Sequence, residues 1–440
     1  MAPLRILIVG ASVSGPVAAY WLARTTDATI TVVERFPNLR TNGQNIDIRI
    51  VGVTVMRKML GMEAAVRAAT TTLEGMSFVH EDGTPLAVLK SSGDPNQQSL
   101  VSEYEILRGD LARILYDLTK GEDRIKYVFG EQVVSITQQD GGEDGPATVE
   151  FANGYPAGKY DLVVACDGAT SRTRALGLGC GVRDFIHSQN CWAAYFTIRE
   201  DLLKGSKVSQ GFSVPGGRLL TIDPNPDPSG GNLAMLMGIY PRSDTDAMIP
   251  FRNAAKQGEG ALKAYIASCF DGVGWKTGEI LNGLMISDDF YASEIMQVRA
   301  PSIHKGRLAL VGDAGYAPGF TGTGTSLAIA GAYILAGEIG KCKGDVKAGL
   351  RGYEERMRPI IKDLQKVPPG LPGLLAPQTA WGVYLRNLVF RAVAALMAFK
   401  GIFAWAGKGL AFFASAFGDD KFGIPDYECL ADANGHEHYD

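Results

Sequence analysis

The sequence lacks the features that would mark a metal protein, a disulfide-stabilised domain or a nucleic-acid-binding protein. Its six cysteines are scattered with no Cys-x-x-Cys pair, and the histidines near some of them do not have zinc-ligand spacing. This argues against a metal site and a disulfide framework, and it favours a reducing compartment. The net charge of −4 gives no electrostatic basis for binding nucleic acid.

A clean membrane-spanning run is also missing. The first apolar run begins so close to the N-terminus that we expect no secretory signal, and we expect a cytoplasmic protein. The segment 381–417 is strongly apolar, but Arg386, Arg391, Lys400 and Lys408 interrupt it. Two interpretations of this segment remain open: helices that pack over the rest of the protein, or weak contact with the surface of an intracellular membrane.

The chain is organised around its first thirty-five residues. A short β-branched run from Leu4 ends at Gly10, a helical pattern covers 14–24, and a second β-branched run ends at Glu34. The glycine-bearing turn places N–H groups of a helix N-terminus above the strand, which is a phosphate site. Glu34 has the position of the carboxylate that binds a ribose with a free 2′-hydroxyl. The alternative is a strand–helix–strand unit whose glycines serve only tight packing.

Two later strands end in the same way. The run from Tyr160 ends in Asp167-Gly168, and the run from Gly306 ends in Gly312-Asp313, followed by a glycine-rich loop and a helix over 326–339. Ligands of α/β sheets bind at the carboxyl ends of such strands. For both aspartates the alternative is a turn or capping role after a strand.

The remaining pattern predicts an α/β fold with a Rossmann-like nucleotide domain, an inserted antiparallel-sheet substrate domain and a C-terminal helical tail. Helices are predicted over 53–69, 104–118 and 353–367, a hairpin over 73–90, and strands over 126–150 and 185–300. The predicted domains are 1–75, 100–184 and 295–367 for the nucleotide, 76–99 and 185–294 for the substrate, and 368–440 for the tail. Gln44, Asp47 and Arg49 form a polar group that faces either a cofactor or solvent.

Three motifs stand in a fixed order along the chain. They are Gly10-x-Ser12-x-x-Gly15 with Glu34-Arg35, Cys166-Asp167-Gly168 with Ser171-x-x-Arg174, and Gly312-Asp313-Ala314 with Pro318. In this combination the sequence, over about 4–360, resembles the FAD-dependent aromatic hydroxylases, the single-component flavoprotein monooxygenases. The tail resembles that of fungal secondary-metabolism members. Ser12 replaces the usual middle glycine, and Tyr316 stands where the family usually has histidine.

The resemblance implies a set of FAD-binding residues. They are Gly10, Ser12, Ser14 and Gly15 at the pyrophosphate, Glu34 at the adenosine ribose, Arg35 along the adenine, Arg108 at the phosphate or ribitol, Asp167 in a motif shared by FAD and NAD(P)H, Asp313 at the phosphate-ribityl region, and Pro318, Gly322 and Gly324 beside the isoalloxazine. Candidates for steering the substrate are Arg49, Tyr195, Phe212 and Tyr316, and for the aromatic side chains the alternative is packing.

The implied activity is oxygen insertion into an apolar aromatic or polycyclic small molecule, by hydroxylation or epoxidation, in secondary metabolism. In the family, flavin reduced by NAD(P)H reacts with O2 to form the hydroperoxide that delivers oxygen. The sequence contains no second complete Rossmann unit, so NAD(P)H is expected to dock transiently. A flavin halogenase is disfavoured because the Trp-x-Trp-x-Ile-Pro signature is absent. The alternatives are an FAD oxidase or reductase without oxygen insertion, or a non-catalytic redox-sensing flavoprotein.

Overall fold

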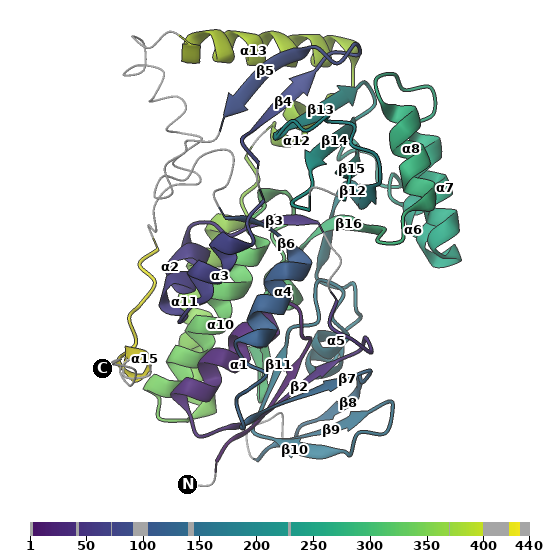
Figure 1. The fold of residues 1–440 in the computed structure, drawn as a ribbon. Coiled ribbons are helices and arrows are strands. Elements are labelled where there is room, and N and C mark those ends of the chain that lie inside the picture. The colour runs from purple at the N-terminus through teal and green to yellow at the C-terminus, as the bar shows by residue number, and fades with distance from the viewer. Residues whose placement is uncertain are drawn as a thin grey trace.

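A six-stranded sheet carries the first, second and third motifs at the ends of neighbouring strands (Figure 1). The structure is a computed structural model that describes residues 3–40, 44–71, 73–90, 104–139, 145–227, 230–368, 370–398 and 422–431. The strand order is β17-β18-β11-β1-β2-β7, and every pair is parallel except β17 with β18. The strands are β1 (Arg5–Val9), β2 (Thr29–Glu34), β7 (Ile125–Phe129), β11 (Leu162–Ala165), β17 (His304–Lys305) and β18 (Leu308–Leu310).

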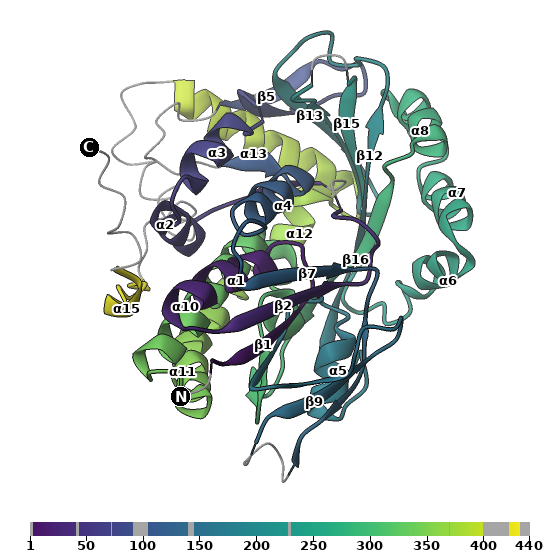
Figure 2. The same ribbon diagram turned by 60° about the horizontal axis from the view of Figure 1, so that its bottom comes forward.

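Helices and a small sheet cover the two faces of this parallel sheet. Figure 2 shows α1 (Ser14–Thr25), α10 (Gly324–Lys341) and α11 (Val346–Leu364) on one side. On the other side lie α5 (Arg172–Leu178) and an antiparallel sheet of β8 (Val133–Thr137), β9 (Ala147–Phe151) and β10 (Gly158–Tyr160). The central strands are continuous apolar runs because both of their faces are buried.

A second large sheet of seven strands lies beyond the carboxyl ends of the parallel strands (Figure 1). Its order is β16-β12-β15-β14-β13-β4-β5, and only β13 and β4 pair in parallel. The strands are β4 (Gly75–Val79), β5 (Pro85–Lys90), β12 (Ile186–Ile198), β13 (Val208–Val214), β14 (Arg218–Pro224), β15 (Asn232–Ile239) and β16 (Tyr291–Val298). The predicted hairpin over 73–90 is therefore part of this seven-stranded sheet, and the predicted fold class is confirmed. We call this sheet the substrate sheet, after the predicted substrate domain, whose role stays a prediction.

Three helices that the sequence interpretation missed cover the outer face of the seven-stranded sheet. They are α6 (Ile249–Gln257), α7 (Glu259–Cys269) and α8 (Thr277–Ile286). Trp192, Leu220 and Leu236 alternate with their neighbours along the strands and pack against these helices. The opposite face of the sheet is turned toward the nucleotide domain. Between the two large sheets lies a short pair, β3 (Asn45–Asp47) and β6 (Glu105–Leu107).

Two predicted helices have different bounds in the structure. The predicted helix over 53–69 is two helices, α2 (Val51–Lys58) and α3 (Met62–Ala68), because Gly61 adopts a left-handed conformation with φ of 75°. The predicted helix over 104–118 begins only at Arg108, as α4 (Arg108–Asp117). Its first residues form β6 instead, since their backbone pairs with β3.

The described part of the C-terminal tail returns to the protein at two places. Helix α12 (Leu371–Leu375) is followed by α13 (Ala380–Ala398), where Arg386 donates to Ser213 Oγ at 2.6 Å and lies over the ring of Phe78. Near α15 (Glu428–Ala431), the Tyr427 hydroxyl donates to Glu338 of α10 at 2.9 Å. These contacts agree with the packing interpretation.

The outer side of α13 is apolar and exposed, with Trp381 80% accessible. No helix among the described residues is both long and apolar enough to span a bilayer. Contact with a membrane surface stays a prediction. The predicted tail residues 399–421 and 432–440 lie outside the described residues.

Candidate active site

The turn between β1 and α1 requires glycine at two positions. The Gly10 N–H donates to Val33 O at 2.8 Å, and a Cβ on Gly10, whose φ is +109°, would lie 2.5 Å from the carbonyl oxygen of Cys166. A Cβ on Gly15 would lie 1.9 Å from the carbonyl oxygen of Gly10. Val13, at the N-cap of α1, provides no side-chain acceptor. The first N–H groups of α1 are therefore left for an anionic ligand.

Glu34 fixes the glycine turn to the end of β2. Its Oε2 accepts the N–H of Ala11 at 3.0 Å, and its Oε1 accepts the N–H of Phe36 at 3.1 Å. Each carboxylate oxygen has a second lone pair, so these bonds leave room for a ribose hydroxyl. The ribose contact itself stays a prediction.

Four arginines line the cavity above this turn, together with Glu34, Glu131 and Asp167. Arg35, Arg40 and Arg108 line it, and Arg108 Nη2 donates to Ser12 Oγ at 3.3 Å. Burial, and then the charge of Arg108, lowers the pKa of Arg40. Repulsion between these arginines fits a site that binds an anion, because the negative charge of a pyrophosphate would offset it.

The second motif forms another wall of the same cavity. The Asp167 carboxylate accepts the Ser171 hydroxyl, the Thr173 N–H at 3.1 Å and the Thr173 hydroxyl at 2.9 Å. Asp167 therefore fastens the first turn of α5, which is the capping role considered as its alternative. Its proposed contact with FAD or NAD(P)H stays a prediction.

Arg174 locks the second motif to the third. Its side chain is fully buried, and Nη1 donates to Ala169 O at 3.0 Å and to Ala314 O at 2.7 Å. Ala169 follows Asp167-Gly168, whereas Ala314 lies in α9 (Asp313–Tyr316). A single guanidinium thus sets the distance between two segments far apart in sequence.

The third motif places a carboxylate at the start of α9. The Asp313 side chain is exposed to solvent, yet the protein packed around it raises the pKa of its carboxyl by desolvation, while Arg108 opposes the increase. A Cβ on Gly324, the first residue of α10, would lie 3.6 Å from Asp313 Oδ1. The Pro318 carbonyl accepts Gln297 Nε2 at 2.9 Å, and Gly322 ends the following 3₁₀ turn, Gly319–Thr321, with φ of 69°. This loop contacts β16 of the seven-stranded sheet.

Arg49 lies beside the start of α10. Its N–H donates to Ser326 Oγ at 2.9 Å, and its guanidinium pairs with Asp47 at 3.2 Å. Nearby, three buried acceptor atoms have no partner among the described residues: Gln44 Oε1, Asn45 Oδ1 and Asp47 Oδ1. Orphaned acceptors at this depth fit a flavin ring, which carries an N–H at N3. Arg49 is buried and residues 44–47 are half-buried, which favours the cofactor-facing alternative, and contact of this group with the cofactor stays a prediction.

Tyr195 and two acids that the sequence interpretation missed lie where the sheets approach each other. Tyr195 pairs in register with Tyr291, and burial raises the pKa of Tyr195, with further contributions from Cys191, Tyr291 and Asp223. Burial, then the charges of Asp47 and Asp223, raises the pKa of Glu105 to about 8. The alternation of β14 gives Asp223 the same face as Thr221, a signal that strand periodicity offered.

Two predicted substrate residues have other roles. Phe212 lies on the helix-covered face of the sheet, 5.6 Å from the ring of Trp275, so its predicted role is wrong. Tyr316 is 1% exposed, and its hydroxyl bonds to that of Tyr353 at 3.0 Å. A Cβ on Gly331 of α10 would lie 1.9 Å from the Tyr316 hydroxyl. Tyr316 therefore packs between α10 and α11, and the structure does not support its predicted catalytic role.

The three motifs and the parallel sheet define a nucleotide-binding oxidoreductase fold. A family model described as FAD binding domain matches residues 4–366. The chain belongs to this family of FAD-dependent monooxygenases, it is an enzyme, and FAD is its cofactor.

Two curated relatives and one solved structure show the extent of the similarity. The FAD-dependent monooxygenase asL4 of Sarocladium schorii is 34% identical over 420 residues, which cover 90% of this chain and 94% of the relative. The flavin-dependent monooxygenase eupH of Phoma sp is 34% identical, with 87% and 90% coverage. The crystal structure of tetracycline destructase Tet(55) has a TM-score of 0.71 and 29% identity, and the match covers 90% of this chain and 96% of that one.

Proposed function

We propose that the enzyme uses NAD(P)H and O2 to hydroxylate or epoxidise an apolar aromatic or polycyclic small molecule in secondary metabolism. One oxygen atom enters the substrate, the other leaves as water, and NAD(P)H supplies the two electrons. The observation that carries the proposal is the convergence of the first two motifs on one cavity, with the third motif bonded to the second through Arg174 and the inner face of the seven-stranded sheet beyond it. The tetracycline destructases, whose name denotes a polycyclic substrate, support the substrate class.

The inner face of the substrate sheet suits a mainly apolar molecule. Met235, Met237 and Ile295 are partly buried there. Phe320 packs in the same cluster, and it belongs to the loop 318–324 expected beside the isoalloxazine, which we call the flavin loop. Burying apolar surface of a substrate against this face contributes about 25 cal/mol per Å² to its binding. The apolar face favours a substrate with few charges.

One edge of this face is polar and positions a hydroxyl or carbonyl of the substrate. Glu105 Oε1 accepts both Asn45 Nδ2 at 2.9 Å and Thr71 Oγ1 at 3.1 Å. With a pKa of about 8, Glu105 is mostly neutral at pH 7. Because Oε1 already accepts two hydrogen bonds, we assign the proton to Oε2. We infer that this carboxylic acid donates to an acceptor atom of the substrate, whereas Asp223 accepts from a donor.

FAD, when bound, supplies hydride acceptance and oxygen activation. The chain's own residues do the remaining work. The glycine turn and Arg108 hold the dinucleotide, Arg49 and its neighbours fix the ring edge, and the closely packed sheets exclude water from the reaction. The described residues contain one nucleotide-binding unit of the Rossmann type, which supports transient docking of NAD(P)H.

The test is a screen of aromatic and polycyclic compounds with the FAD-loaded protein under ¹⁸O2. NADPH and NADH consumption and isotope incorporation are followed in the same samples. The proposal predicts a compound that accelerates nicotinamide oxidation and emerges with one ¹⁸O atom. Accelerated consumption with only hydrogen peroxide as product, for every compound, would identify an oxidase instead.

A further inference from the structure

A second cavity, of about 900 Å³, lies where the substrate sheet meets α9 and α11. Its walls are 187–190, 297–300, 358–359, 361–362 and 365–367, with Arg242, Ile303, Gly315 and Tyr316, and we call it the Arg299 cavity. No described residue lines both this cavity and the cavity of the first two motifs, and Gly315 and Tyr316 bring the end of the third motif to the Arg299 cavity. Its volume is in the range of small-ligand sites.

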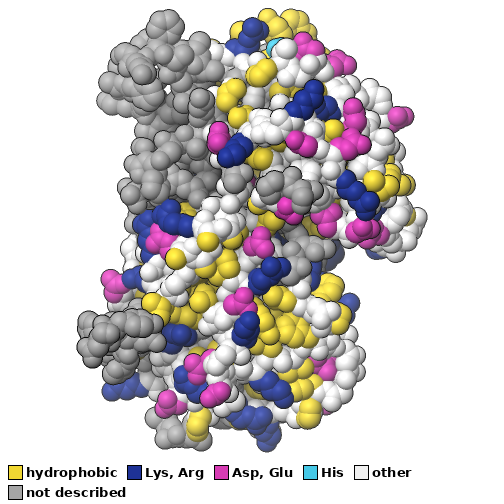
Figure 3. All heavy atoms as spheres, in the orientation of Figure 1, with side chains coloured by type: hydrophobic (Ala, Val, Ile, Leu, Met, Phe, Trp, Pro, Cys, Tyr) yellow, Lys and Arg dark blue, Asp and Glu magenta, His cyan; other side chains and the backbone are white. Residues whose placement is uncertain are grey.

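The charge of the Arg299 cavity has one sign. None of the described residues that line it is an aspartate or a glutamate, although the chain as a whole carries a net charge of −4. On the face shown in Figure 3, by contrast, acidic and basic side chains are interspersed. A concave surface with cations only attracts anions and concentrates them.

Three of the cations have no acidic partner in the described part of the chain. Arg358 pairs with Glu354, and Lys366 pairs with Asp363 at 2.9 Å. The described residues offer no such carboxylate to the others, which are Arg242, Arg299 and Lys362. Three uncompensated cations around one cavity suit a ligand that carries more than one negative charge.

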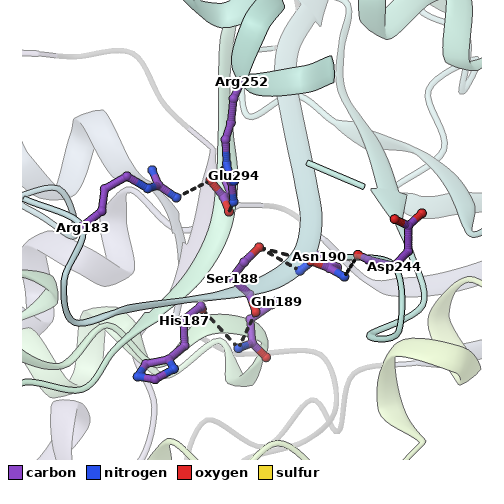
Figure 4. A network of polar contacts seen from close by, with 8 residues as sticks. All are labelled: Arg183, His187, Ser188, Gln189, Asn190, Asp244, Arg252 and Glu294. Atoms are coloured by element: carbon purple, nitrogen blue, oxygen red, sulfur yellow. Dashed lines mark hydrogen bonds and ion pairs between the residues drawn. The ribbon is translucent and has the colours of Figure 1, made fainter. Parts of the chain in front are cut away.

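The wall that carries Arg242 is held in place by two partly buried hydrogen bonds. Asn190, in a left-handed conformation with φ of 50°, donates from Nδ2 to Pro241 O at 2.9 Å and to Asp244 O at 2.7 Å. These bonds fix the loop on both sides of Arg242. Figure 4 shows Asn190 beside Ser188 and Asp244.

Ion pairs to the buried carboxylate of Glu294 hold α6, the helix that follows the loop of Arg242, against β16. Glu294 of β16 pairs with Arg252 of α6 at 2.5 Å and with Arg183 at 2.9 Å, and Figure 4 shows the two guanidinium groups converging on this carboxylate. The wall is therefore preorganised, so that ligand binding costs little conformational entropy.

The floor of the cavity is bonded to the flavin loop. Arg299 Nη2 donates to Gln297 Oε1 at 2.7 Å, and Gln297, only 1% exposed, donates to Pro318 O at 2.9 Å. Gln365 makes a parallel connection, since its Nε2 donates to Ala317 O at 3.1 Å. A ligand held by Arg299 is thus two hydrogen bonds away from the loop expected beside the isoalloxazine.

We propose that the Arg299 cavity binds a phosphorylated ligand of nucleotide size through Arg242, Arg299 and Lys362. Phosphate oxygens accept bidentate hydrogen bonds from the two arginines. The hydrogen bonds through Gln297 connect the bound ligand to the flavin loop. A phosphorylated ligand of this size is either the electron donor NADPH or a separate regulatory nucleotide. If it is NADPH, the inference rests on the proposed function.

The first experiment is a calorimetric titration of the oxidised, FAD-loaded full chain with 2′,5′-ADP. The wild type is compared with the double variant Arg242→Gln/Arg299→Gln, and Lys256→Gln serves as the control because Lys256 is exposed on α6 outside the cavity. We expect the double variant to lose about 10-fold or more in affinity and the control to be unchanged. No binding to the wild type, or equal affinity in all three proteins, would overturn the proposal.

The second experiment distinguishes the sources by rapid-mixing measurement of flavin reduction. If NADPH is the ligand, the double variant needs correspondingly more NADPH for half-maximal reduction, with the limiting rate unchanged. If reduction is unchanged while 2′,5′-ADP binding is lost, the site belongs to a regulatory nucleotide. The titration involves no turnover, so it stays informative even if the monooxygenase reaction is not found.

Discussion

Glu105→Gln tests whether the acid between the two sheets is neutral in the folded protein. Its pKa of about 8 lies above the ordinary value of 4.5, with burial as the largest cause. Between these values the folded chain holds a proton that the unfolded chain has released. The contribution of this proton to the free energy of unfolding is therefore fully present below about pH 4.5, and it is lost as the pH rises toward 8.

The size of the effect follows from the difference of about 3.5 pKa units, at about 1.4 kcal/mol for each. The wild type loses on the order of 5 kcal/mol across this window relative to Glu105→Gln, which does not titrate. With an unfolding entropy of about 2 cal/mol/K per residue, that is roughly 5 °C in Tm for a chain that unfolds as one unit. The amide introduced by this substitution keeps an oxygen that can accept from Asn45 and Thr71.

The assay is scanning calorimetry of the FAD-loaded wild type and variant from pH 5 to 8.5. The exposed Glu150→Gln serves as the control for the loss of a surface carboxylate. We expect the Tm of the wild type to fall relative to Glu105→Gln as the pH rises, while Glu150→Gln follows the wild type. Parallel curves for all three proteins would refute the assignment of a neutral Glu105.

Three further substitutions test other parts of the structure. The Gly15→Ala variant should purify without flavin, because the new Cβ would lie 1.9 Å from Gly10 O. The control variant Gly121→Ala, whose new Cβ meets open space, should keep its flavin. Equal flavin-to-protein absorbance ratios in the two variants would contradict the role of Gly15. Arg49→Ala should uncouple NADPH oxidation from product formation, and normal oxidation with normal coupling would show that Arg49 does not act at the flavin. Arg386→Met removes one hydrogen bond from α13 to Ser213 of the seven-stranded sheet and one to Leu375 of α12, together worth about 1–3 kcal/mol, and should speed proteolysis of the tail. An unchanged cleavage rate would contradict that docking.

The nucleotide domain was predictable because its signals are local. The apolar runs of β1, β2 and β11 are buried on both faces, and each required glycine or acid follows within a few residues. The order of these motifs predicted the FAD fold without any knowledge of contacts. Even so, the capping bonds of Asp167 and the inward position of Tyr316 required the structure, because both depend on contacts that the local pattern does not specify.

The substrate domain was less predictable. Leu262, Ile266 and Phe270 recur at helical spacing along and just after α7, but the glycines that punctuate this region favoured a strand interpretation. Glu105 and Asp223 belong to strands of different sheets, far apart in the sequence, and only tertiary packing brings their charges together. Their importance was therefore not visible in the local pattern.

The central claim is that one bound FAD, held by three distant motifs, activates O2 beside an apolar substrate. The most direct measurement is the flavin content of the reconstituted protein together with ¹⁸O incorporation into product. The structure predicts a yellow protein with one FAD per chain and one labelled oxygen atom per product molecule. A colourless protein that fails to take up FAD on reconstitution would contradict it.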